Sequence, residues 1–270
     1  MTHARNVVVL PDAVALATAA ADHVVEVLQG VLAQRERAHL VLAGGSTPRA
    51  MNALLSIPPR RDRVAWERVV FWFGDERCVS PDDPESNYRM NRETLLDRLQ
   101  VPADRVHRMR GEDDDPGAAA ADYAVILARE LGDRPRLDLI LLGMGPDGHT
   151  ASLFPGTLAG IQANRLVVAH YVAKLDRWRI TLTPTTINLA RHVAITAGGA
   201  EKADALHAVL DGPRDVDVYP SQVVQPREGE LRWFVDAAAA SRLAATSPKA
   251  SFRPARSSAT RWMRLKAIIS

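Results

Sequence analysis

Short apolar runs alternate along the chain with segments in which apolar residues recur every three or four positions. The apolar runs are residues 6–10, 39–43, 69–73, 137–142 and 193–196. Because these runs are apolar at consecutive positions, they are typical of parallel strands buried on both faces. Helical stripes over residues 24–32 and 203–210 lie among them. The alternation predicts an α/β fold, a Rossmann-like and mostly parallel sheet with helices on both faces.

One further strand follows a different pattern. Over residues 179–183, Arg179 and Thr181 alternate with Ile180 and Leu182. A period of two places the polar side chains on one face and the apolar ones on the other. We therefore expect a smaller, half-exposed β element that presents a cation.

Composition and charge divide the chain near residue 243. Apolar residues make up 47% and charged residues 24%, which excludes wholesale disorder. Residues 244–270 carry six basic residues and no acidic one, so the body, residues 1–243, is net acidic although the whole chain is +2. We expect residues 1–243 to form one domain that does not bind nucleic acid, followed by a basic, disordered tail.

Other features narrow the setting. No run reaches the ~18 uninterrupted apolar residues that a membrane span needs, and the N-terminus does not resemble a secretion signal. Cys78 is the single cysteine, which excludes an internal disulfide and a cysteine metal cluster. The acidic run 113–115 precedes a proline and a helical pattern, which favours a solvated helix start over a metal site. We expect a cytoplasmic protein that holds no metal.

The second strand is followed by a turn that suits a phosphate. It reads Gly44-Gly45-Ser46-Thr47-Pro48, with Thr47 as a candidate N-cap and Pro48 at a first helical position. Free N–H groups at such a helix start bind phosphate, although a capped turn without a ligand has the same pattern. The pattern Gly44-x-Ser46 also resembles the nucleophile elbow of serine hydrolases. Its fifth position is Pro48 rather than glycine, however, and no Ser–Asp–His order follows.

The third strand is followed by Gly-Asp-Glu-Arg at residues 74–77. A guanidinium such as that of Arg77 stays charged and suits an anionic substrate or a developing oxyanion. The alternative is a solvated loop with an Asp–Arg pair.

The fourth strand is followed by a glycine-rich turn that contains Asp147 and His149. Gly143, Gly145 and Gly148 satisfy the dinucleotide pattern GxGxxG, but the acid required about 20 residues later is replaced by Val-Val-Ala at 167–169. An imidazole is a natural proton shuttle at neutral pH, and a nearby carboxylate would orient it. A histidine whose role is purely structural is the alternative.

Together these segments resemble the 6-phosphogluconolactonase family, within the glucosamine-6-phosphate isomerase/6-phosphogluconolactonase superfamily. The matching stretches are residues 42–48, 71–77, 86–87, 141–155, 178–183, 197–202 and 219–222. They run in the family's order over residues 5–243.

The resemblance implies an enzyme that hydrolyses 6-phosphogluconolactone to 6-phosphogluconate in the oxidative pentose phosphate pathway, without metal or cofactor. Its partner would be a small sugar-phosphate lactone, and it would bind neither nucleic acid nor a membrane. The chain would be a monomer or a weak homodimer. The matching positions are His149, Asp147 and Arg77 for catalysis, and Gly44, Gly45, Ser46, Thr47, Arg179 and Lys202 for substrate binding. Our hypothesis is that His149 activates the water.

The chain departs from the family in two places, and two other functions stay open. Many members carry Lys-Pro-Pro-Pro before the strand arginine; residues 174–178 instead read Lys-Leu-Asp-Arg-Trp, which leaves the role of Lys174 unsettled. The tail has no family counterpart. An amino-sugar-phosphate isomerase or deaminase would need an Asn-Glu pair where this chain has Leu153-Phe154. A sugar-phosphate sensor without catalysis is the other alternative.

Overall fold

The computed structural model describes residues 6–244 apart from residues 159, 160, 162 and 163. Its largest feature is a six-stranded parallel sheet. In spatial order its strands are β1 (Asn6–Leu10), β9 (Glu230–Asp236), β8 (His192–Ala197), β5 (Leu139–Gly143), β2 (Ala38–Leu42) and β3 (Val69–Phe73). The five predicted strands are confirmed, and β9 is added to them. The predicted tail lies outside the described residues except for Ala244.

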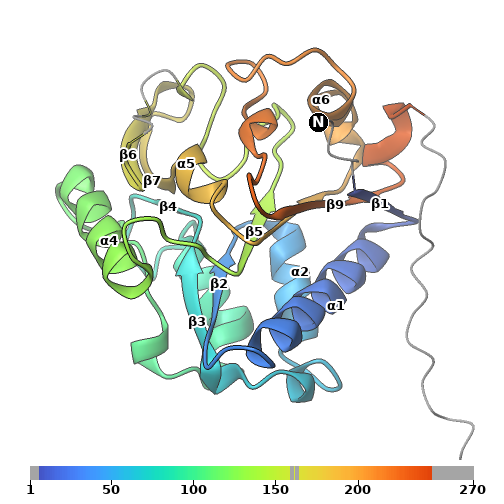
Figure 1. The fold of residues 1–270 in the computed structure, drawn as a ribbon. Helices are drawn as coiled ribbons and strands as arrows, with labels where there is room; N and C mark the ends of the chain where they lie inside the picture. The colour runs from blue at the N-terminus through green and yellow to red at the C-terminus, as the bar shows by residue number, and fades with distance from the viewer. Residues whose placement is uncertain (1–5, 159–160, 162–163, 245–270) are drawn as a thin grey trace, which may run out of the picture.

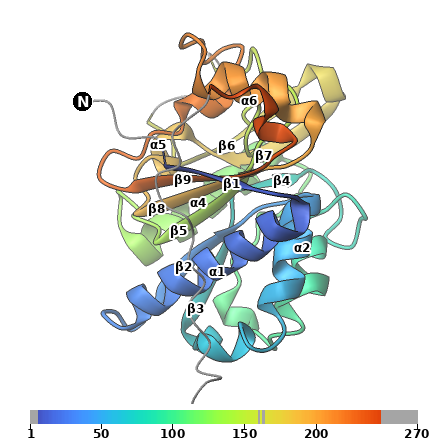
Figure 2. The same ribbon diagram turned by 90° about the vertical axis from the view of Figure 1, so that its right-hand side faces the viewer.

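Helices cover both faces of this sheet, as predicted (Figure 1, Figure 2). They are α1 (Ala13–Leu32), α2 (Ser46–Leu55), α3 (Asn87–Asn91), α4 (Pro116–Leu131), α5 (Pro184–Ile187) and α6 (Ala203–Leu210). Helices α1 and α2 pack side by side on one face, and α6 lies on the other together with a smaller sheet. The Asp115 carboxylate accepts hydrogen bonds from the N–H groups of Gly117 and Ala118, which confirms the acidic run as a helix start.

Helix α1 is the one described helix that is long and apolar enough to cross a membrane. More than half of that apolar segment is buried inside the protein, and the helix packs against the sheet and α2. Its apolar composition is therefore explained by its place in the core.

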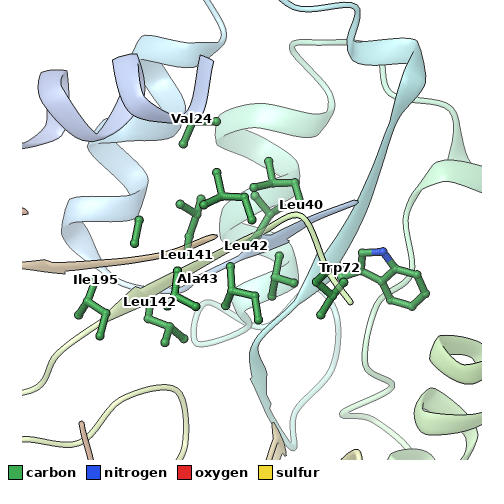
Figure 3. Close-up of a cluster of buried hydrophobic side chains, with 14 of the residues drawn as sticks. Val24, Leu40, Leu42, Ala43, Trp72, Leu141, Leu142 and Ile195 are labelled. Atoms are coloured by element: carbon green, nitrogen blue, oxygen red, sulfur yellow. The ribbon is translucent and has the colours of Figure 1, made fainter. Parts of the chain in front are cut away.

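The core is built from consecutive apolar residues of the central strands (Figure 3). Each of four side chains on these strands is 3% exposed or less: Leu40, Leu42, Leu141 and Ile195. Their strands, β2, β5 and β8, are each hydrogen-bonded to another strand on both sides. Both faces of these strands are covered, so their side chains need not alternate between apolar and polar.

The smaller sheet is antiparallel, in the order β4 (Asp75–Arg77), β7 (Arg177–Leu182) and β6 (Val167–Val172). The charged run after β3 thus forms a strand, so the alternative of a solvated loop is wrong. Along β7, exposure falls from one end to the other instead of alternating between faces: Arg177 and Trp178 are exposed, and Arg179 to Leu182 are buried. Thr181 is buried because Ser152 covers it and donates a backbone hydrogen bond to its hydroxyl.

The strand order places a switch point between β2 and β5. From β2 the chain continues to β3 on one side, and then crosses to β5 on the other side of β2. Ligands of open α/β sheets bind at the carboxyl ends of strands beside such a point. The turns after β2, β3, β5 and β8 meet at this edge.

Candidate active site

A cavity of about 210 Å³ lies at this edge of the sheet. Of the residues singled out from the sequence, its lining includes Gly44, Gly45, Ser46, Thr47, Arg77, His149 and Lys202. Three turns that are far apart in the sequence thus line one cavity. The segment that carries Lys202 lines it as well. Asp147 and Arg179 lie outside the lining.

The first wall is the start of α2. The helix begins at Ser46 after Gly45, whose φ of 107° suits glycine. No side chain caps this helix, so the expected N-cap role of Thr47 is wrong. Its first N–H groups and the two hydroxyls are free of side-chain partners among the described residues and border the cavity.

Gly44 lies tightly against the next wall. A Cβ at Gly44 would come within 1.9 Å of Asn87 Oδ1. Asn87 also lines the cavity, and its Nδ2 donates to the backbone and carboxylate oxygens of Asp75. Apart from the presence of Ser86-Asn87 among the resembling stretches, no sequence pattern predicts this packing.

Glu76 explains why three charged residues follow a buried strand. Its carboxylate is buried and accepts hydrogen bonds from the N–H groups of Arg77, Asn87 and Tyr88 and from the Ser86 hydroxyl. Burial raises the pKa of Glu76, against the lowering effect of these backbone hydrogen bonds. Glu76 thereby fixes the start of α3 beside the cavity.

Two arginines of the smaller sheet lie opposite one another on neighbouring strands. Arg77 of β4 is paired with Arg179 of β7. Arg77 reaches the cavity and donates to the backbone carbonyl of Glu85. Arg179 is 9% exposed and donates to the Trp178 carbonyl, so the cation expected at the surface is buried. Burial, and then the charge of Arg77, lowers the pKa of Arg179.

The third wall holds a histidine and a carboxylate in contact. Asp147 Oδ1 lies 2.6 Å from His149 Nδ1, and Lys174 Nζ donates to Asp147 Oδ2 over 2.8 Å. Burial opposes ionisation of Asp147, but the hydrogen bonds from Lys174 and His149 outweigh it and lower its pKa to about 2. An ionised Asp147 accepts a hydrogen bond from His149 Nδ1–H, and in that neutral tautomer Nε2 carries the lone pair. Lys174, whose role the sequence leaves unsettled, is thus a partner of Asp147.

The glycine-rich turn does not form a dinucleotide loop. Met144 bridges back to Thr150, so the turn folds on itself instead of opening a helix. A Cβ at Gly145 would lie 2.1 Å from the His149 ring, so glycine allows the imidazole its position. The ring also stacks on Phe154, with centroids 4.4 Å apart.

A hydrogen bond ties the histidine turn to β4. Ser152 Oγ donates to Asp75 Oδ2 over 2.6 Å, and Asp75 lines the cavity. Sequence reasoning missed this pair, because the two residues are 77 positions apart.

Lys202 closes the cavity from the turn after β8. Asp236, at the end of β9, accepts from the Gly199 N–H and holds this turn. Burial lowers the pKa of Lys202, against the opposite effect of Glu201 and Asp236. Within the described part of the chain, no hydrogen bond or ion pair of the Lys202 ammonium is found. The cavity is thus lined by a half-buried cation that forms no ion pair with a carboxylate of the described residues.

Comparison with known proteins agrees with this geometry. Residues 11–233 match the family model for glucosamine-6-phosphate isomerases/6-phosphogluconolactonase. A 6-phosphogluconolactonase of Nostoc is 39% identical over 88% of this chain and 98% of its own length, and one of Mycobacterium tuberculosis is 37% identical over the same shares.

Solved structures give the same result. The 6-phosphogluconolactonase from Trypanosoma cruzi superposes with a TM-score of 0.79 at 31% identity, covering 90% of this chain and 98% of its own. A monomeric glucosamine-6-phosphate deaminase shares the fold at a TM-score of 0.75, but only 21% identity. The chain is therefore a member of the glucosamine-6-phosphate isomerase/6-phosphogluconolactonase family.

Proposed function

We propose that this protein hydrolyses 6-phosphogluconolactone to 6-phosphogluconate, the lactonase step of the oxidative pentose phosphate pathway, in the cytoplasm. The observation that carries the proposal is the cavity itself. It is lined by an imidazole that a carboxylate holds, by the start of a helix, and by a lysine that pairs with no carboxylate of the described residues. A sugar ester with a phosphate at its far end needs this combination of groups.

In the proposed mechanism His149 acts first as a base. Its Nε2 takes a proton from water while the water oxygen bonds to C1 of the lactone. The tetrahedral intermediate then collapses, the bond from C1 to the ring oxygen breaks, and the imidazolium returns the proton to that oxygen. Asp147 holds the ring in place, and Arg77 stabilises the developing oxyanion.

Phosphate binding fixes the position of the lactone. The N–H groups and hydroxyls of Ser46 and Thr47, with the Gly44–Gly45 backbone, would hold the phosphate, and Lys202 would pair with it. Arg179 lies behind Arg77 and adds positive charge to this side of the cavity without lining it.

The isomerase or deaminase alternative is disfavoured at one position. That reaction would need an acid after the histidine turn, where Phe154 instead stacks on His149. An apolar ring cannot transfer a proton.

The proposed activity is tested with lactone generated in place from glucose 6-phosphate. We expect the purified protein to shorten the lifetime of the lactone far below that of spontaneous hydrolysis, and to release no ammonia from glucosamine 6-phosphate. Ammonia release would favour the deaminase, and binding of the phosphosugar without either reaction would favour the sensor.

Replacing Lys202 tests phosphate binding. We expect Lys202→Met to raise KM by about 10- to 100-fold, the effect of losing one charge-assisted hydrogen bond, with a smaller change in kcat. Arg49→Met is the matched control, because this exposed arginine lies on α2 but does not line the cavity. Equal KM values in the two variants would contradict the assignment.

Replacing the partners of His149 tests how the imidazole is held. We expect Asp147→Asn to lower kcat by roughly 10- to 100-fold, a part of what general acid–base catalysis contributes, because an amide holds the imidazole less firmly than a carboxylate does. Lys174→Met leaves the Asp147 carboxylate in place, so kcat falls only a few-fold. Because the pKa of Asp147 is about 2, this carboxylate stays ionised throughout the neutral range. Loss of wild-type activity at mildly acidic pH then reflects a group other than Asp147; kcat profiles between pH 5 and 9 check this.

A further inference from the structure

A second cleft, of about 680 Å³, lies at the opposite edge of the sheet, among the amino ends of β5, β8 and β9. Four arginines and two histidines line it: Arg35, Arg136, Arg191, Arg232, His23 and His192. Strands of five or six residues separate it from the candidate active site, a distance of roughly 15–20 Å. A ligand bound here would therefore not contact a lactone in the candidate active site.

Hydrogen bonding in this cleft is incomplete. The described residues contain five buried side-chain nitrogen or oxygen atoms without a hydrogen-bond partner, and three of them belong to this cleft. They are Arg191 Nε, His192 Nδ1 and Arg232 Nε. Buried polar atoms left without a hydrogen-bond partner are costly, and the two Nε atoms can only donate, so their presence in one cleft points to a missing acceptor.

Carboxylates near the cleft neutralise only part of its positive charge. The buried Asp138 carboxylate accepts from Arg35 over 2.9 Å and lies 3.3 Å from Arg191 Nε. Arg136 bonds to the carbonyl of Glu228 and lies 3.4 Å from its carboxylate. These contacts account for three of the four guanidinium groups.

Arg232 is the exception. It forms no ion pair with a carboxylate among the described residues, and its NH1 is 3.2 Å from His23 Nδ1. Burial, followed by the charges of Arg232 and His192, lowers the pKa of His23 to about 3. His23 is therefore neutral, and it accepts a hydrogen bond without cancelling the charge of Arg232.

The remaining acids of the cleft lie at its rim. Glu26 is exposed, and the side chains of Glu228 and Glu230 are 80% and 67% exposed. Glu230 is 3.6 Å from His192. Water screens these carboxylates more than it screens the guanidinium groups, whose side chains are 30% exposed at Arg191 and 34% at Arg136.

We propose that this cleft is a second ligand site, which binds the phosphate group of a small molecule. A guanidinium presents a planar fork to a phosphate, and Nε with one terminal nitrogen forms one such pair of donors. A phosphate held between Arg191 and Arg232 would supply the acceptor that Arg232 Nε lacks, and a second acceptor for Arg191 Nε, whose contact with Asp138 at 3.3 Å does not form a hydrogen bond.

Calorimetric titration with inorganic phosphate at low ionic strength tests this site. The protein carries Lys202→Met, so that phosphate binding in the candidate active site is weakened. We expect one phosphate to bind in this background, and Arg232→Gln to weaken it at least tenfold. Arg129→Gln is the control, since this exposed arginine pairs with Glu130 away from the cleft.

A second variant distinguishes loss of the phosphate site from misfolding of the Arg232→Gln protein. Glu26→Gln removes a rim carboxylate that repels the anion, so we expect phosphate to bind about two- to threefold more tightly. Phosphate binding that is absent, or that neither Arg232→Gln nor Glu26→Gln changes, would overturn the proposal. Lactonase activity is not part of this readout, so the outcome is independent of the proposed function.

Discussion

Replacing His149 with glutamine is expected to lower kcat by about 10³- to 10⁴-fold, at the upper end of what general acid–base catalysis contributes. The amide of glutamine can still bond to Asp147, but it cannot take a proton from water. Because His149 is not placed at the phosphate end of the cavity, we expect 6-phosphogluconate to bind with nearly unchanged affinity.

The chain offers a matched control for this variant. His207 on α6 lies 3.5 Å from Asp211, another His–Asp pair, and is half exposed outside the cavity. His207→Gln should leave kcat unchanged. The proposed role of His149 is wrong if its variant keeps more than a tenth of wild-type turnover, measured by lactone consumption with correction for spontaneous hydrolysis.

Replacing Arg77 with glutamine is expected to lower kcat by about 10²- to 10³-fold, the usual effect of removing one donor to an oxyanion. The charge on that oxygen develops only in the transition state, so KM should change much less than kcat. Steady-state rates on the lactone separate the two effects.

Two other arginines of the same sheet sharpen this comparison. Arg177 is exposed at the start of β7, and Arg177→Gln should have no effect on either constant. Arg179 does not line the cavity, so Arg179→Gln should lower kcat less than Arg77→Gln does. If Arg77→Gln instead raises KM and spares kcat, Arg77 binds phosphate and the oxyanion has another partner.

Much of the fold was predictable because its strands are buried on both faces. Continuous apolar runs marked β1, β2, β3, β5 and β8, and a parallel sheet brings the turns after its strands to one edge. This is why residues as distant as Ser46 and His149 could be expected near each other from the sequence.

What the sequence did not reveal depends on long-range contacts. Thr181 is covered by the histidine turn, whose Ser152 N–H donates to its hydroxyl, and Arg179 is buried as well, although the alternation of both residues with apolar ones predicts an exposed face. Likewise Glu76 is buried because it accepts backbone hydrogen bonds from α3, a helix that begins 11 residues later. Neither contact has a local signature.

The contact of Lys174 with Asp147 also could not be predicted from the sequence. The two residues are 27 positions apart, and the strand β6 separates them in the sequence. The start of α2 was misjudged for a local reason: the positive φ of Gly45 places the helix start at Ser46, so that Thr47 is already inside the helix.

A crystal structure of the His149→Gln variant with 6-phosphogluconate is the most direct test of how the substrate would lie. We expect the phosphate at Ser46, Thr47 and Lys202, and the C1 carboxylate between residue 149 and Arg77. A sugar bound in the reverse direction, with its phosphate on Arg77 and C1 away from residue 149, would contradict the proposed mechanism.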